Sequence, residues 1–311
     1  MNAATDIATP EKPATSAVPW SLWLRQVRAI FRLEIRKNFL GRRAVLIYLL
    51  ALMPVMMLLA AAVLVFAIDA AATNTITDAQ GHIISQTTTR SGPFQEFSRL
   101  GTFFAGIYGA LILRTVVFFG CAWIFMNLFR GDVVDKSLHY YFLTPVRREV
   151  LLVGKYISGI VTSAVLFTMT TVVSMLLVYF PNFASQSSRF FLDGPGLGQL
   201  LSYAGITILA CIGYGAFFIV VGLFFRNPII PALFLYGWEW INFLLPPLLK
   251  KISVIHYLNS LVPIQLSQGP LAVIAEPTPA WIAIPGLLLV TALVLLAAGY
   301  RIRHLEIKYG E

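Results

Sequence analysis

The chain has 311 residues, of which 58% are hydrophobic and only 12% are charged, and its mean hydropathy is +0.78. Soluble domains are about 45–50% apolar and about 25% charged, so this composition excludes a soluble globule and predicts a protein that crosses a membrane several times. The net charge of +9 would suggest nucleic-acid binding in a soluble protein. Here the basic residues cluster beside hydrophobic segments, where they orient the chain and meet anionic lipid. We therefore expect no nucleic-acid partner.

The N-terminal part is expected to comprise a disordered segment followed by an amphipathic helix. Residues 1–20 are rich in Ala, Thr and Pro and lack the features of a signal peptide. Residues 21–43 have a helical period, with Trp23, Val27, Ile30 and Phe31 on one face and Arg25, Arg28, Arg32 and Arg36 on the other. This pattern predicts a helix in the cytoplasmic interface of a membrane; a basic helix that only sets the topology is an equal alternative. Glu34 and Asn38 interrupt the apolar face, so part of that face is expected to meet protein.

Six segments are long and apolar enough to cross a bilayer core of about 30 Å, which needs about 20 helical residues. They are residues 44–68, 101–126, 150–180, 200–225, 229–249 and 281–300. Six crossings place both ends of the chain, including the tail 301–311, on one side of the membrane. That side carries seventeen Lys and Arg and the opposite loops carry five, so the positive-inside rule predicts cytoplasmic termini. The predicted fold is an all-α membrane protein with a six-helix transmembrane domain, residues 44–300.

Two segments of this domain have an unusual composition. The fourth predicted span contains Gly205, Gly213, Gly215 and Gly222. Small residues let helices approach closely, so we expect these glycines to serve packing rather than a hinge. Residues 250–280 mix apolar residues with proline and are expected to form short broken helices that dip back into the membrane, where protein must satisfy their backbone.

The loop 129–149, between the second and third spans, is predicted to be cytoplasmic and ordered. Residues 132–143 lack Pro and Gly, and Asp132 and Asp135 lie in the first turn of the helix expected there, where the helix dipole favours anions. Pro145 then ends the helix. Lys155 lies about one turn inside the next span, where its side chain is expected to snorkel to the interface.

This loop also presents a group of aromatic and imidazole side chains: His139, Tyr140, Tyr141 and Phe142. Exposed aromatic residues are enriched at the hot spots of protein interfaces. They are equally typical of an interfacial belt with rings at the depth of the lipid headgroups. The residues themselves leave both interpretations open.

Two ionisable residues lie deep in predicted spans, Arg114 in the second and Glu239 in the fifth. Each would cost about 2.5 to 3.5 kcal/mol to insert alone. Because their depths match, we hypothesise that they form a pair or share a polar cavity. A salt bridge that only locks the bundle is as plausible as a role in a substrate pathway.

The chain lacks the motifs of several enzyme classes. Residues 149–156 come nearest to a phosphate-binding loop, but they lack the first Gly and the Ser or Thr after the Lys. The four histidines are scattered and have no metal-ligand spacing, and no Gly-x-Ser-x-Gly elbow is present. We therefore expect no enzymatic activity in this chain, no metal, and no cofactor of its own.

The loop resembles the corresponding loop of ABC-2 type transporter permeases. The residues that carry the resemblance are an acidic residue followed by Lys136-Ser137-Leu138, then Thr144-Pro145-Val146-Arg147-Arg148, then Leu151-Leu152-Val153-Gly154-Lys155. The six-span layout with cytoplasmic termini and a long last outer loop extends the similarity over nearly the whole chain. Many family members have Glu where this chain has Asp132 and Asp135, and a Gly before a Thr-Leu pair where it has Lys136-Ser137-Leu138; the acidic charge is kept.

The resemblance implies a permease subunit, an exporter by expectation, that works as a dimer in the plasma membrane, the inner membrane of a bacterium. ATP and Mg would be bound by a separate ATP-binding cassette subunit, and residues 21–43 would be an elbow helix. The implied docking surface for that subunit is Asp132, Asp135, Lys136, His139, Tyr140, Tyr141, Phe142, Arg147 and Arg148. Arg114, Glu239 and Asn242 would line the route at the interface between two permease subunits.

Two other classes of function compete with this expectation. A six-span channel or secondary transporter would need no ATPase, but a secondary transporter is expected to have inverted repeats and paired broken helices, which the sequence does not show. A membrane-bound transferase acting on lipid would need clustered acidic or His residues near the outer surface, and Asp69, Asp78 and Glu96 are dispersed.

Overall fold

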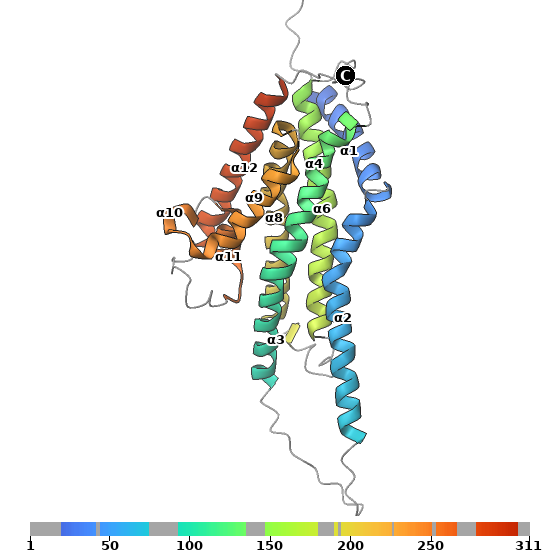
Figure 1. Ribbon diagram of the computed structural model, residues 1–311, viewed down its shortest axis with the longest axis vertical. Helices are drawn as coiled ribbons and strands as arrows, with labels where there is room; N and C mark the ends of the chain where they lie inside the picture. Colours follow the sequence, from blue (N-terminus) through green and yellow to red (C-terminus); the bar gives the residue numbers. More distant parts are fainter. Residues whose placement is uncertain are drawn as a thin grey trace, which may run out of the picture.

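The helices of the bundle account for all regular structure that the computed structural model describes. The described residues are 20–41, 44–74, 93–134, 147–179, 190–191, 194–225, 227–250, 253–265 and 278–303. The elements are α1 (Trp20–Leu40), α2 (Ala44–Asn74), α3 (Pro93–Ile107), the π-helix η1 (Tyr108–Val117), α4 (Phe118–Val134), α6 (Arg148–Tyr179), α8 (Gly196–Phe224), α9 (Ile229–Ile241), the 3-10 turn η3 (Asn242–Leu244), α10 (Pro247–Lys250), α11 (Val254–Leu261) and α12 (Ala280–Arg303). Figure 1 shows α1 and the C-terminal end of α12 at the same end of the bundle.

Five helical segments in the described ranges are long and apolar enough to cross a membrane: Ala44–Leu64, Ser98–Gly131, Arg148–Tyr179, Gly196–Phe224 and Ala280–Ile302. Their outward side chains are large and apolar, for example Leu64 at 61% exposed, Met169 at 62% and Leu296 at 70%. Exposing apolar surface to water costs about 25 cal/mol per Å², so these faces belong in lipid. The prediction of an all-α membrane protein is thus confirmed, with five of the six predicted spans present as long helices.

The predicted span 229–249 differs from the structure. The helix that begins there, α9, has 13 residues and ends at Ile241, after which the chain makes a 3-10 turn. At 1.5 Å per residue α9 is about 20 Å long, shorter than a bilayer core of about 30 Å. Pro246 and Pro247 follow the turn, and proline prevents a helix from continuing through them. Hydropathy extended the predicted span across these prolines because the residues around them are apolar.

After this break the chain forms the short helix α10 and then, within the described part of residues 250–280, the short helix α11, where short helices were expected. Figure 1 places α10 and α11 beside the middle of the bundle rather than at its end. The buried residues of α11, Val254, Ile255, His256 and Leu258, pack it against α8 and α12. Helix α11 is therefore packed against protein. Residues 266–277 lie outside the described ranges.

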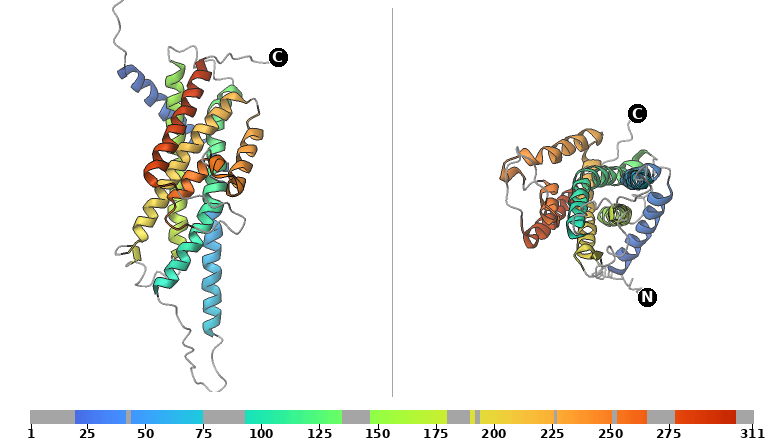
Figure 2. Two further views of the ribbon diagram at one scale, coloured as in Figure 1. Left: turned by 90° about the vertical axis from the view of Figure 1, so that its left-hand side faces the viewer. Right: turned by 90° about the horizontal axis from the view of Figure 1, so that it is seen from below.

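Helix α6 is the centre of the bundle. It packs against α1, α2, α4, α8 and α12, and the end-on view in Figure 2 shows it surrounded by other helices. Helix α1 packs closely on α6, because a Cβ added at Gly154 would lie 3.0 Å from Ile30. The arginine face of α1 is exposed while Ile30 is partly buried. The two faces of α1 are thus as predicted, and its apolar face meets protein at this point.

The predicted second span contains a ten-residue π-helix, η1, between α3 and α4. In a π-helix the backbone bonds join residues five apart, and the Thr115 hydroxyl follows this spacing by donating to the carbonyl of Ala110 at 3.2 Å. Such helices are rare and occur often at functional sites. The sequence analysis did not predict η1. It carries Arg114, whose side chain is only partly buried, while Ile112, Leu113, Val116 and Val117 are fully buried.

Three of the four glycines singled out in the predicted fourth span, all on α8, allow close packing, as predicted. A Cβ at Gly215 would lie 2.5 Å from the ring of Phe125, and one at Gly222 would lie 3.1 Å from the backbone of Met126, both on α4. At Gly213 the neighbours are Leu287 of α12 and Val254 of α11, each at 3.2 Å. Gly205 faces open space, with nothing within 4 Å.

Candidate functional site

The predicted docking surface lies at the end of the bundle where α4 stops and α6 starts. Asp132 is in the last turns of α4, but only its backbone is described. Six further residues of the surface lie outside the described ranges: Asp135, Lys136, His139, Tyr140, Tyr141 and Phe142. The expected helix at residues 132–143 falls mostly in that part of the chain. The structure therefore describes the base of this loop.

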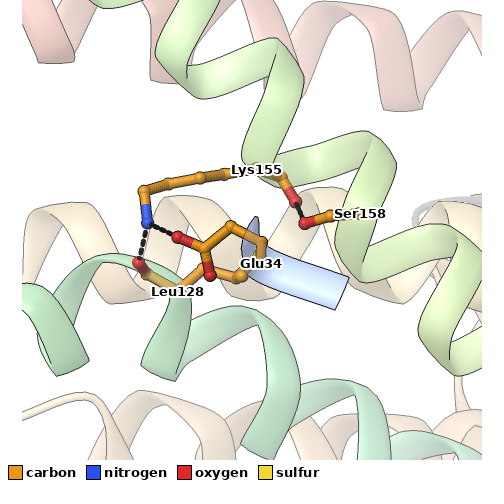
Figure 3. Close-up of polar contacts among 4 residues, drawn as sticks. All are labelled: Glu34, Leu128, Lys155 and Ser158. Atoms are coloured by element: carbon orange, nitrogen blue, oxygen red, sulfur yellow. Dashed lines mark hydrogen bonds and ion pairs between the residues drawn. The ribbon is translucent and has the colours of Figure 1, made fainter. Parts of the chain in front are cut away.

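A buried ion pair holds that base together (Figure 3). The ammonium of Lys155, on α6, contacts the carboxylate of Glu34, on α1, and donates to the carbonyl of Leu128, on α4, at 2.8 Å. The side chains of Lys155 and Glu34 are 0% and 2% exposed. The Lys155 ammonium also lies 5.4 Å from the centre of the Phe129 ring. One lysine thereby joins three helices at the two ends of the loop.

The expectation that Lys155 snorkels to the interface is wrong. Its side chain is fully buried because Glu34 and the carbonyl of Leu128 offer it partners inside the protein. The sequence contained a signal for this pair, since Glu34 interrupts the apolar face of the N-terminal helix. A carboxylate on a face that packs against protein needs a cation there. Nothing local in the sequence identified Lys155 as that cation.

Three arginines at this end of the bundle contact residues on neighbouring helices. The guanidinium of Arg147 lies 4.8 Å from the centre of the Trp23 ring on α1. Arg148 donates to the carbonyl of Ile302 on α12 at 3.3 Å, and Arg301 lies 5.4 Å from the ring of Phe224 on α8. Of the predicted docking residues, Arg147 and Arg148 are therefore placed at the start of α6, in contact with α1 and α12.

A small cavity adjoins the buried ion pair. Its volume is about 30 Å³, and its lining is Glu34, Lys37, Asn38, Ala44, Ile47, Trp123, Ile124, Asn127 and Leu128. The side-chain nitrogen of Asn38 is buried without a hydrogen-bond partner. The volume suits one or two water molecules and is too small for a substrate.

The second group of predicted site residues lies inside the bundle, around Arg114. The Arg114 guanidinium lies 5.5 Å from the centre of the Trp240 ring of α9. Tyr214 of α8 and Glu239 of α9 are near enough to act on it electrostatically. Within the described part of the chain no ion pair or hydrogen bond joins Arg114 to Glu239, and the Nε atom of Arg114 is buried without a partner. The two residues share a polar region, but the hypothesised direct pair is not formed.

Glu239 has a different partner, the N-terminus of α11. Its Oε2 atom accepts hydrogen bonds from the Ser253 hydroxyl at 2.7 Å and from the backbone N–H of Ile255 at 3.1 Å. Glu239 is 2% exposed. A carboxylate at a helix N-terminus satisfies free N–H groups and complements the dipole. Glu239 therefore anchors the short helix α11 to α9, a role that the sequence analysis did not anticipate.

Two further polar side chains of this region are buried without hydrogen-bond partners. The Tyr214 hydroxyl is on a residue with 0% exposure, and Asn242, which was predicted to line the pathway, is 5% exposed with an unpartnered side-chain nitrogen. Buried polar atoms are normally hydrogen-bonded. The region around Arg114 thus contains hydrogen-bonding capacity that the described residues do not use.

Within the described residues, no group of three or more His, Cys, Asp or Glu side chains has an arrangement that could hold a metal ion. Comparisons of the chain with models of protein families, with curated proteins and with solved structures found no match.

Proposed function

We propose that this protein is the membrane-spanning permease subunit of an ATP-binding cassette transporter of the ABC-2 type. In this proposal it is an exporter that works as a dimer in the plasma membrane, with both termini in the cytoplasm. A separate ATPase subunit binds ATP and Mg and docks on the loop 129–149. The sequence resemblance of that loop is the origin of the proposal.

The observation that supports it best is the buried contact at the base of the loop. Lys155 donates to the carbonyl of Leu128 at 2.8 Å, so the end of α4 and the start of α6 are joined by a single side chain. Glu34 brings α1 into the same contact. A loop that receives force from a partner needs its two ends fixed to the helices that move. Here both ends are fixed by a buried, charge-assisted contact rather than by exposed side chains.

The arrangement of α6 supports the same proposal. Force applied to the loop would enter α6 at its first residues, Arg147 and Arg148, which contact α1 and α12. Because α6 packs against five helices of the bundle, a displacement of its end would reach most of the membrane domain. The mechanism would be rocking of packed helices, which requires no reactive group in this chain.

Charge reversal at Asp132 and Asp135 tests the proposal. The chain would be co-expressed with a tagged candidate ATPase subunit, purified as a complex and reconstituted in liposomes. Asp132→Lys with Asp135→Lys is expected to weaken co-purification or to uncouple ATP hydrolysis from transport, while the thermal stability of the permease stays unchanged. The matched control is Arg99→Glu. Arg99 is exposed on α3, near the start of the continuous helical segment that runs through η1 and α4 to Asp132. Normal docking and coupling in the double reversal would refute the assignment of the loop.

A further inference from the structure

Arg114 is a charged residue in mid-span without a hydrogen-bonded partner. It lies halfway along the 34-residue segment Ser98–Gly131 and makes no hydrogen bond to any described residue, although its Nε atom is buried. An arginine at the centre of a membrane is unfavourable to insert. Intramembrane charges usually face a bundle interior or a pathway and pair there. The guanidinium therefore has an unmet requirement for an anion.

Glu239 does not meet that requirement, despite its proximity. Its Oε2 atom is engaged by Ser253 and by the N–H of Ile255 at the start of α11. Moving this oxygen to Arg114 would leave the Ser253 hydroxyl and the Ile255 N–H without their acceptor. One oxygen of the carboxylate is thus held by α11, and no described residue accepts a hydrogen bond from the guanidinium.

The neighbours of Arg114 extend its capacity to bind an anion. The Tyr214 hydroxyl is buried without a partner and lies within electrostatic range of Arg114. The centre of the Trp240 ring lies 5.5 Å from the guanidinium carbon, which is close enough for a cation–π contact. The π-helix η1 sets the position of Arg114 between α8 and α9. Two donors and an aromatic ring from three helices are therefore brought near one another.

We propose that Arg114, Tyr214 and Trp240 form a binding site for the anionic headgroup, a phosphate or carboxylate, of an amphiphilic molecule. Guanidinium groups bind both anions bidentately, and the phenol adds one further donor. An amphiphile, rather than a free anion, is favoured because Trp240 is 38% exposed and lies on the same helix as exposed apolar side chains, Leu233 at 55% and Ile241 at 52%. An acyl chain would lie against these residues. The existence of this binding site does not depend on the function proposed above. That the bound amphiphile is the transported substrate rests on that function.

The test measures binding to the purified permease chain alone in nanodiscs of zwitterionic phosphatidylcholine. The probe is radiolabelled dodecyl phosphate, compared with dodecyl phosphocholine and with inorganic phosphate. Saturable binding of dodecyl phosphate is expected, with at least ten-fold weaker binding of the other two. Arg114→Gln is expected to reduce the affinity for dodecyl phosphate at least ten-fold, about 1.4 kcal/mol, and Arg114→Lys less. Tight binding of inorganic phosphate would show that the site binds a free anion rather than an amphiphile, and this result would overturn the proposal.

Three further variants make the result specific. Tyr214→Phe keeps the ring and removes only the hydroxyl, so it should weaken binding about three-fold or more; it also tests the site if Arg114→Gln fails to fold. Glu239→Gln should leave binding intact or tighten it, because it removes a nearby negative charge. Arg99→Gln, an exposed arginine on α3, should change nothing. Wild-type affinity in both Arg114→Gln and Tyr214→Phe would overturn the site. Because no ATPase is present, that failure would leave the docking test untouched.

Discussion

Lys155 and Glu34 form an ion pair that joins α6 to α1 across 121 residues of sequence, with both side chains no more than 2% exposed. Taking two charges out of water costs several kcal/mol for each ion, and their attraction restores this only when the geometry and the remaining hydrogen bonds are good. The carbonyl of Leu128 supplies one of those bonds. The pair is therefore sensitive to the removal of either partner.

Lys155→Met should destabilise the protein strongly. The substitution leaves the Glu34 carboxylate buried without a cation, and breaking a buried pair in this way costs about 3–5 kcal/mol. The measurement is thermal unfolding of the purified protein in detergent, in which the midpoint temperature should fall well below that of the wild type. Arg36→Gln, an exposed position on the same helix α1, should shift the free energy of unfolding by no more than about 0.5 kcal/mol.

The double variant Glu34→Gln with Lys155→Met separates a buried charge from a loss of packing. With both charges removed, much of the stability lost in Lys155→Met should return, because replacing a whole buried pair is often close to neutral. If the double variant is as unstable as Lys155→Met alone, the loss arises from packing and the charge argument is wrong.

The sequence predicted the features that depend on local pattern. Apolar length identified the five long helices, and the period of residues 21–43 identified α1 with its arginine face exposed. It also indicated that Glu34 lies on a face that meets protein. The partner could not be read from the sequence, because Lys155 reaches Glu34 only after α6 packs on α1, and no local spacing encodes that contact.

The features that the sequence did not predict correctly all depend on tertiary contacts. The π-helix η1 has no sequence signal, since its apolar residues would form an α-helix equally well. The fifth span was predicted to extend past Pro246 because hydropathy is averaged over many residues, so a short turn between apolar segments is not detected. Depth alone suggested that Glu239 pairs with Arg114, whereas the carboxylate meets the N-terminus of α11, a helix of eight residues whose position depends on that break.

Gly215→Ala should destabilise the contact between α4 and α8. The added methyl group would lie 2.5 Å from the Phe125 ring, so the buried ring or the helices must shift, at a typical cost of about 1–3 kcal/mol. Gly205→Ala is the matched control on the same helix, where nothing lies within 4 Å. There the alanine should be neutral or stabilising by up to about 1 kcal/mol. Thermal unfolding of the two variants side by side decides the matter; equal midpoints would contradict the packing role of Gly215.

Thr207→Val should disrupt a buried hydrogen-bond network. The Thr207 hydroxyl lies 3.0 Å from that of Tyr108 on η1 and 3.2 Å from that of Thr171 on α6. Valine has the same shape but leaves these groups with fewer partners, so the free energy of unfolding should fall by about 1–3 kcal/mol. Thr102→Val is the control, because its hydroxyl bonds only to the carbonyl of Ser98 on an exposed surface. A loss no larger than in Thr102→Val would show that the network contributes nothing.

Glu239→Gln should loosen α11 specifically. The neutral amide loses the interaction with the helix N-terminus, and we expect a loss of about 1–2 kcal/mol. Hydrogen–deuterium exchange over residues 254–261 should rise by about ten-fold or more, while exchange in the central part of α6 stays unchanged. Ser253→Ala removes one donor to the same carboxylate oxygen and should accelerate exchange in the same residues.

Double-mutant cycles then distinguish the cap of α11 from a pair with Arg114. Glu239→Gln and Ser253→Ala should lose less together than the sum of their separate effects, because the first removes the charge and the second the donor of the same charge-assisted hydrogen bond. Glu239→Gln and Arg114→Gln should be closer to additive, since no hydrogen bond or ion pair joins the two side chains. If the coupling free energy with Arg114 exceeds that with Ser253, the carboxylate is mainly the partner of the arginine. The requirement of Arg114 for an external anion, and the binding site built on it, would then disappear.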